Sequence, residues 1–232
     1  MSFFFDSIES AIFLIGSLDP ELFEIVGVSL RVSFFSSLIS SMIGIPAGLL
    51  ISLKEFWFKR FLLTILNTLL ALPTVVVGLL IYSFISRRGI FGPLDLLYTQ
   101  KAIIIGQVFL IIPIITTYTI SAISRIDDRY RKTALTLGAN ALQTAWVIIK
   151  EARFGIVAAI ILAFGRVIAE VGISMMLGGN AKGFTRTMTT AMALEYDKGE
   201  FVLSIALGIV LLCVSFMVNI FFNYLQGRSS GE

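Results

Sequence analysis

The sequence contains no histidine and a single cysteine, Cys213, which lies inside an apolar run. Zinc and haem iron usually need histidine or cysteine ligands, and a disulfide needs two cysteines, so this composition argues against such sites. We therefore expect no bound metal and no cofactor. Histidine is also the commonest general base, and no Gly-x-Ser-x-Gly nucleophile motif occurs, so we expect no catalytic site in this chain.

Charged residues are also scarce. They make up 14% of the 232 residues, whereas hydrophobic residues make up 57%, and the mean hydropathy is +0.94. Soluble domains are nearer a quarter charged, so the composition indicates a protein that crosses the lipid bilayer several times. The net charge of +3 does not indicate a nucleic-acid partner, because the basic residues fall in short loops, as the positive-inside rule predicts.

No Gly-x-x-x-x-Gly-Lys-[Ser/Thr] motif occurs, so the chain lacks the phosphate-binding loop by which most transport ATPases bind ATP. Any ATP-driven process that involves this chain must therefore draw its energy from a separate subunit.

Five segments are apolar and long enough to cross a hydrocarbon layer of roughly 30 Å, which takes about 20 helical residues. They cover residues 25–53, 61–85, 102–124, 154–177 and 201–225. Pro46, Pro73 and Pro113 lie inside three of them, and we expect each proline to kink its helix. The sequence thus predicts an all-α membrane protein with five transmembrane helices in a single domain, residues 1–232.

The N-terminal segment is acidic and has no Lys or Arg before Arg31, which favours an external location. Residues 8–18 are too short to span the membrane, so we expect a short helix along its outer surface. With the N-terminus outside, five spans leave the C-terminus inside, and most loop Lys and Arg residues then face the cytoplasm.

The loop at residues 125–153 is polar and basic, and it is flanked by apolar spans. We expect residues 127–148 to form two short helices with a bend near Gly138. They would present a small apolar knob, framed by Tyr130, to a cytoplasmic partner. The knob would consist of Ala134, Leu135, Leu137 and Ala139.

Arg166 and Glu170 lie within the fourth span, four residues apart and therefore on one helical face. Charges inside a membrane are costly and usually face the protein interior or a water-filled cavity. Two interpretations remain open: the two side chains satisfy each other and fix helix packing, or Arg166 gives positive potential to an anion path while Glu170 holds it.

The segment that follows combines glycines with hydrogen-bond donors suited to an oxyanion. These residues are Gly178, Gly179, Asn180, Thr185, Arg186 and Thr187. They form either an ordinary loop that ends the fourth helix or a gate at the external side of a pathway.

Within the basic loop, Lys132-Thr133-Ala134-x3-Gly138-x9-Ile148 resembles the EAA loop of ABC importer permeases, whose pattern is Glu-Ala-Ala-x3-Gly-x9-Ile-x-Leu-Pro. Ala134, Gly138 and Ile148 match in register, whereas Lys132 and Thr133 replace Glu and Ala. The loop also lies between the third and fourth of five spans, as in that family. The resemblance implies that these residues couple the chain to an ATPase subunit.

Further segments look like the tungstate-type permeases, which are related to the molybdate and sulfate permeases. These segments are residues 19–22, 29–33, 72–78, 170–172, 178–180 and 185–190. The resemblance implies a type I ABC importer permease in a prokaryotic inner membrane, with tungstate as cargo. It also implies three protein partners, which are a second copy of the chain, cytoplasmic P-loop ATPase subunits and an external oxyanion-binding protein.

Other functions remain open at this point. The cargo could be molybdate, sulfate or another solute, because span composition does not measure the radius of an anion. A secondary transporter driven by an ion gradient would show inverted repeats or midplane carboxylates, and only Glu170 qualifies. A structural membrane subunit would have no transport path.

Overall fold

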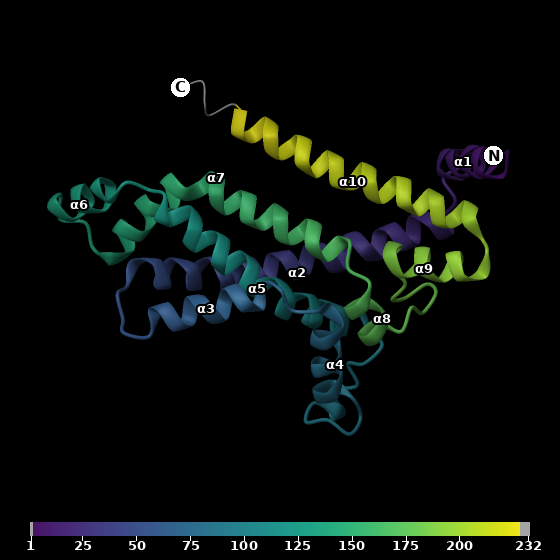
Figure 1. Ribbon diagram of the computed structural model, residues 1–232, viewed down its shortest axis with the longest axis horizontal. Coiled ribbons are helices and arrows are strands. Elements are labelled where there is room, and N and C mark those ends of the chain that lie inside the picture. The colour runs from purple at the N-terminus through teal and green to yellow at the C-terminus, as the bar shows by residue number, and fades with distance from the viewer. Residues whose placement is uncertain (1, 228–232) are drawn as a thin grey trace.

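The computed structural model describes residues 2–227, and it is all-helical, with no strand among these residues. Figure 1 shows the order of the helices. The α-helices are α1 (Ser2–Gly16), α2 (Pro20–Leu53), α3 (Lys59–Leu69), α4 (Thr74–Ile85), α5 (Gln100–Ser124), α6 (Asp128–Thr136), α7 (Ala141–Ile168), α8 (Gly172–Gly178), α9 (Met188–Lys198) and α10 (Phe201–Gly227). A short 3-10 helix, η1 (Gly92–Leu94), precedes α5. The predicted all-α class is confirmed.

Three of the described helices are long and apolar enough to cross a membrane, and the number reaches the predicted five if each of two bent helix pairs is one span. Helices α2, α5 and α10 are continuous, whereas α3 and α4 meet at 101° and α7 and α8 meet at 59°. Pro73 precedes α4 in extended conformation, where its missing N–H costs no helix hydrogen bond. Helices α2 and α5 continue through Pro46 and Pro113, so among these three prolines only Pro73 marks a break between helices.

Small residues bring α2 and α5 together over a long contact. A Cβ atom on Gly48 would lie 2.9 Å from the Thr116 carbonyl oxygen and 2.8 Å from Thr119 Cβ. Gly44 faces the side chain of Ile115 at a similar distance, 3.0 Å. Close backbone approach of this kind holds helices together in lipid, where apolar burial gives little driving force.

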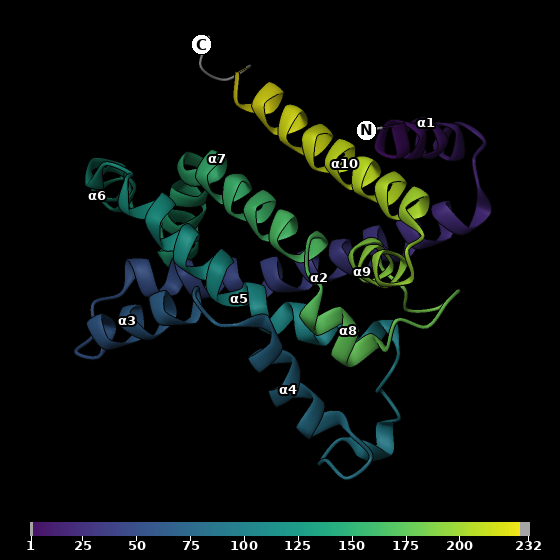
Figure 2. The same cartoon turned by 45° about the vertical axis from the view of Figure 1, so that its right-hand side comes forward.

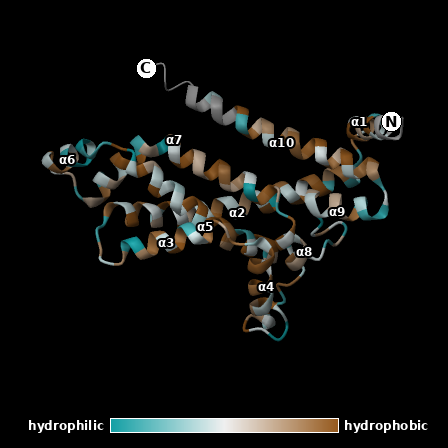
Figure 3. Ribbon diagram, in the orientation of Figure 1, coloured by the Kyte–Doolittle hydropathy of each residue, from teal (hydrophilic) through white to brown (hydrophobic). Residues whose placement is uncertain are grey.

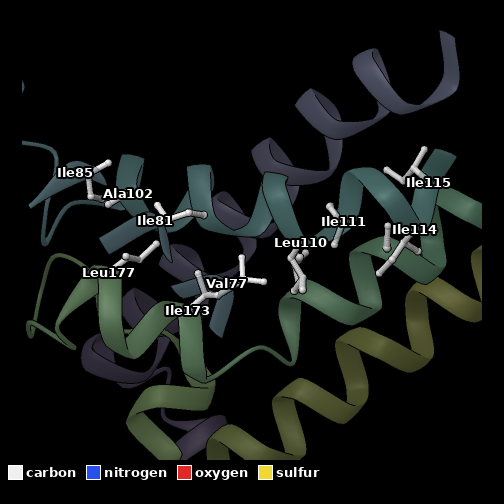
Figure 4. Close-up of a cluster of buried hydrophobic side chains, with 12 residues drawn as sticks. Val77, Ile81, Ile85, Ala102, Leu110, Ile111, Ile114, Ile115, Ile173 and Leu177 are labelled. Carbon is white, nitrogen blue, oxygen red and sulfur yellow. The ribbon is translucent and has the colours of Figure 1, made fainter. Parts of the chain in front are cut away.

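The two broken spans meet each other. Helix α4 projects downward from the body in both views and packs on α8 (Figures 1 and 2). At this contact Gly78 faces Met176, and Gly172 faces the Thr74 hydroxyl at 3.0 Å from the position of a Cβ atom. A cluster of buried aliphatic side chains surrounds it (Figure 4), drawn mainly from α4, α5 and α8. The breaks are therefore parts of one packed unit.

Polar and apolar residues separate along the long axis. Hydrophilic residues gather at α6 and at the turn after α9, near opposite ends, and apolar residues dominate along α10 and α4 (Figure 3). Helix α1 lies beside α10 at the end away from α6 (Figure 1). The expected N-terminal helix is thus present, although it begins earlier than residue 8.

The α2–α5 contact predicts different effects of two alanine substitutions in α2. Gly48→Ala should lower the stability of the detergent-solubilised protein by about 1–3 kcal/mol, because the new methyl group meets a backbone carbonyl. Gly27→Ala is the control, since nothing lies within 4 Å of its Cβ position. It should leave stability unchanged or raise it, because alanine favours helix. Equal melting temperatures for the two variants would contradict this packing.

Candidate functional site

The break between α7 and α8 is organised around an ion pair. The Arg166 guanidinium donates to Glu170 Oε2 at 2.8 Å, and the pair spans one helical turn as the sequence predicts. Glu170 is 3% exposed, whereas the Arg166 side chain is 41% exposed. The carboxylate is therefore held inside the protein while the guanidinium reaches outward.

Glu170 also ties the break to two other segments. Its Oε1 accepts a hydrogen bond from the backbone N–H of Ile173 at 3.2 Å, in the first turn of α8. Its carbonyl oxygen accepts from the Thr189 hydroxyl at 2.7 Å. Charged acceptors are favoured at a helix N-terminus, so the carboxylate stabilises the start of α8 directly.

A cavity of about 480 Å³ lies beside this pair. It opens between α5, α7, α10 and the residue after α3, and Arg166 is the only charged residue of its lining. Tyr118 and Asn219 add polar groups to the wall of the cavity. The rest of the wall consists of aliphatic side chains and Gly165. A single anchored guanidinium in an apolar cavity can attract an anion without surrounding it.

The segment after α8 forms a closed loop in which the glycines are required. Gly179 has φ +69°, and a Cβ there would lie 2.7 Å from the Tyr98 ring. Gly178 packs against Ile103 with a Cβ position 2.7 Å from its side chain. The Thr185 hydroxyl donates to the Gly178 carbonyl, 2.6 Å away, which closes the loop. These contacts account for both glycines and for Thr185 through structure alone.

A cluster of buried threonines begins α9. Thr187 caps the helix through a capping box with Thr190, and its hydroxyl lies 3.2 Å from that of Thr189. Because Thr189 also bonds the Glu170 carbonyl, a chain of contacts joins Arg166, Glu170 and Thr187. Sequence reasoning selected these three residues but not Thr189, whose only signal was its place in the same threonine run.

Arg186 is 9% exposed and lies in a separate charge network. Its guanidinium is 3.6 Å from Glu21 and 3.7 Å from Glu195. Lys182 pairs with Glu21 at 2.6 Å and Lys198 with Glu195 at 3.0 Å. The network joins the start of α2, the loop and α9, and it does not contribute to the cavity beside Arg166.

Asn180 also has a structural partner in this loop. It adopts φ 51°, and its side-chain amide donates to the Thr190 carbonyl at 3.2 Å. Of the predicted pathway residues, Arg166 lines the cavity, and Glu170 holds the Arg166 guanidinium in place. The other predicted residues belong to the loop after α8 and to its ion network.

Gln107 is a buried polar residue within the apolar helix α5. It is 1% exposed, accepts from the Ser36 hydroxyl at 2.8 Å and donates to the Val167 carbonyl at 3.3 Å. It therefore joins α2, α5 and α7 one residue from Arg166. Its pattern in the sequence resembles that of any interhelical amide, so only the packed structure reveals this position.

The basic loop at residues 125–153, which we call the coupling loop, differs from the prediction in one helix. A bend does occur at Gly138, whose φ is +82°, but only one short helix, α6, precedes it. The prediction of a second short helix is wrong, because the long helix α7 already begins at Ala141, before the expected fourth span. Asn140 and Gln143 form a capping box that starts α7 here, and tertiary packing continues the helix through the polar stretch.

The predicted apolar knob is also rearranged. Ala134 is buried and Ile148 is 4% exposed, so neither is presented to a partner. Leu137, 82% exposed, and Leu135, 52% exposed, supply the apolar surface instead. Ala139 is half-buried, while Lys132 and Thr133 are exposed.

A groove of about 510 Å³ runs beside Leu137. It is lined by Asp127, Arg129, Tyr130, Thr133, Ala134, Leu137 and Val147. Beside it Lys132 pairs with Asp128 at 2.9 Å, which lowers the pKa of the Asp128 carboxyl and raises that of Lys132. Both charges are therefore present at neutral pH on this surface.

Comparison with known proteins identifies related sequences over almost the whole chain. A family model described as the binding-protein-dependent transport system inner membrane component matches residues 42–231. A tungstate uptake system permease protein of Campylobacter jejuni is 37% identical over 94% of this chain and 92% of its own. That of Peptoclostridium acidaminophilum is 36% identical over 94% and 96%. A sulfate transport system permease protein of Synechococcus elongatus is 24% identical over 92% and 77%.

Solved structures share the fold. A chain of the methionine ABC transporter MetNI, in an inward-facing conformation, aligns with a TM-score of 0.71, covering 88% of this chain and 94% of its own. A chain of a bacterial ABC transporter that imports alginate aligns with a TM-score of 0.76, covering 95% and 83%. Identities of 18% and 17% make this a likeness of fold, which is that of type I ABC importer permeases, as expected.

The buried end of the ion pair predicts a strong effect of losing Glu170. Glu170→Ala should destabilise the protein by about 1.5–3 kcal/mol, because Arg166 and the Ile173 N–H lose a charged acceptor. Glu170→Gln should cost less, since its amide oxygen can still accept from Ile173. Thermal unfolding of the purified variants measures both.

The control for this prediction is Asp128→Ala, which removes an exposed pair of the same spacing and should leave stability unchanged. The double variant R166A/E170A should recover part of the loss, because no unpaired charge is left. Equal stabilities of Glu170→Ala and Asp128→Ala would contradict a structural role for the pair.

Proposed function

The chain belongs to the family of binding-protein-dependent transport system inner membrane components, and from this premise we propose that it is the permease of a tungstate importer. The observation that carries the cargo is the similarity to two tungstate uptake permeases at 37% and 36% identity over 94% of the chain. The sulfate permease is more distant, at 24%. ATP hydrolysis would take place on a separate subunit.

The docking of the ATPase is proposed at the groove beside Leu137. An exposed leucine next to a groove of about 510 Å³ supplies apolar contact, and the charges of Asp128 and Lys132 set orientation. Gly138 permits the sharp turn that places Leu137 at the tip, because its φ of +82° is unfavourable for other residues.

A second copy of the chain is proposed as the partner of α4. This helix projects from the body (Figures 1 and 2), and the residues that it exposes are almost all apolar. They include Val75, Val76, Leu79, Leu80 and Phe84. Beside them lies an apolar cavity of about 700 Å³. In a two-fold dimer one such arm from each copy can be covered by the other.

Arg166 is proposed as the cationic point of the anion path. The Glu170 carboxylate accepts a hydrogen bond from the Arg166 guanidinium, and Arg166 also lines the cavity. Because the pair is close to neutral overall, an anion is attracted but not trapped, as transport requires. Approach of the two ATPase subunits would then move the paired loops and alternate the access of this cavity. The external binding protein is proposed to dock at the opposite end, near α9.

Cargo and energy source are tested by uptake into proteoliposomes that hold this chain with its ATPase and external binding protein. We expect ATP-dependent tungstate uptake that excess sulfate does not suppress. Uptake of molybdate or sulfate in preference to tungstate would contradict the proposed cargo but would still identify an ATP-driven importer. Flux driven by an ion gradient without the ATPase would instead identify a secondary transporter.

The docking proposal predicts that Leu137→Asp releases the ATPase. A carboxylate at a desolvated contact should reduce the ATPase that co-purifies with the permease by about tenfold or more. Ile90→Asp is the matched control, because Ile90 is 77% exposed but lies in the loop that follows α4. Retention of the ATPase by Leu137→Asp, or its loss from both variants, would argue against the groove as the docking site.

A further inference from the structure

Helix α3 is unusual among the helices that form the spans, because none of its residues is buried. Four leucines are half-buried and form the side that packs toward the body, where α3 contacts α5. These are Leu62, Leu63, Leu66 and Leu69. The remaining residues, apart from half-buried Lys59, are exposed, so α3 presents an outer surface that no described residue covers.

Part of this outer surface is polar. Arg60, Thr64, Asn67 and Thr68 are spaced four, three and one residues apart, which places them on one face of the helix. All four are exposed. The Thr64 and Thr68 hydroxyls donate to the carbonyls of Arg60 and Thr64, so they remain able to accept hydrogen bonds from water.

The position of α3 makes this polar face significant. Its 11 residues are about 16 Å long, roughly half of a hydrocarbon layer, and with α4 they form one of the broken spans. Helix α3 lies below α2 in Figure 1, toward the end of the molecule that carries α6. Amide and guanidinium groups are costly against lipid, so protein or water must cover them.

The charge of Arg60 indicates that water, and not the same face of a second copy of the chain, covers this polar face. In the part of the chain that the structure describes, no carboxylate pairs with Arg60, whereas its neighbour Lys59 pairs with Glu55 at 2.7 Å. In a two-fold dimer, close packing of α3 on the α3 of the other copy would bring the two Arg60 side chains together. This repulsion is relieved when a hydrated gap separates them.

We propose that Arg60, Thr64, Asn67 and Thr68 line the cytoplasmic half of a water-filled anion path. The inference rests on the proposed import function, and it adds a second set of lining residues to Arg166. Arg60, at the cytoplasmic end of the face, attracts the departing anion by its charge. The neutral hydroxyl and amide groups hydrate the anion without holding it.

Cysteine accessibility in the assembled importer tests this inference. The single native cysteine, Cys213, is exposed on α10, so Cys213→Ala gives a background without other thiols. Thr64→Cys and Asn67→Cys place a thiol on the polar face. Ile65→Cys is the matched control, because Ile65 is 38% exposed on the neighbouring apolar part of the same helix.

The probe is a membrane-impermeant anionic methanethiosulfonate, applied to inside-out vesicles that contain the permease with its ATPase. We expect cysteines at 64 and 67 to react about tenfold faster, or more, than the cysteine at 65, since a thiol in lipid stays protonated and unreactive. Slow reaction at all three positions would mean that protein covers this face, and equally fast reaction would mean that α3 is not embedded. Either result overturns the inference.

Uptake measured with the same variants in proteoliposomes separates this inference from the proposed function. Modification of Asn67→Cys adds a fixed negative charge and should reduce ATP-dependent tungstate uptake at least fivefold, or about 1 kcal/mol. The Cys213→Ala background should keep its uptake after the same treatment. Uptake that persists with an unreactive cysteine at 67 would leave the importer intact and remove only the lining role of α3.

Discussion

The buried carboxylate of Glu170 is the constraint on which this structure most depends. A charge that is only 3% exposed in a membrane protein must be compensated, and here Arg166 and the Ile173 N–H do so. Its carbonyl in turn binds Thr189. One residue therefore pairs with the last turn of α7, stabilises the start of α8 and bonds to the first turn of α9. These contacts hold three helices together at the break in the fourth span.

The break lies among closely packed helices. Gly48 lets α2 and α5 approach to backbone contact, and Gln107 connects both helices to the end of α7. Helix α8 then packs on α4, so the two broken spans are in direct contact. Packed cores of this kind shift between discrete arrangements more readily than they deform. Helix α7 begins inside the basic loop at residues 125–153 and carries Arg166, so one helix joins that loop to the cavity.

Much of the site could be anticipated, but the roles of its residues were divided differently. The spacing of Arg166 and Glu170 predicts their ion pair, and Gly138 predicts the bend of the coupling loop. Arg186 looked equally suited to an anion, yet Glu21 and Glu195 neutralise it. Those carboxylates lie far from each other in sequence, so no local pattern could have brought them to Arg186. The burial of Ala134 and Ile148 was not predicted either, because it depends on how their helices pack and not on a local pattern.

The sequence by itself determined the membrane class, the five apolar spans and the family resemblance, because hydropathy and motif spacing are local properties that survive without a fold. Only the tertiary structure decided that Pro73 breaks a span while Pro46 and Pro113 do not. It also decided that Arg166 faces a cavity and that the polar face of α3 stays uncovered. These outcomes depend on which side chains arrive from distant segments to satisfy each backbone and charged group, and that is set by packing.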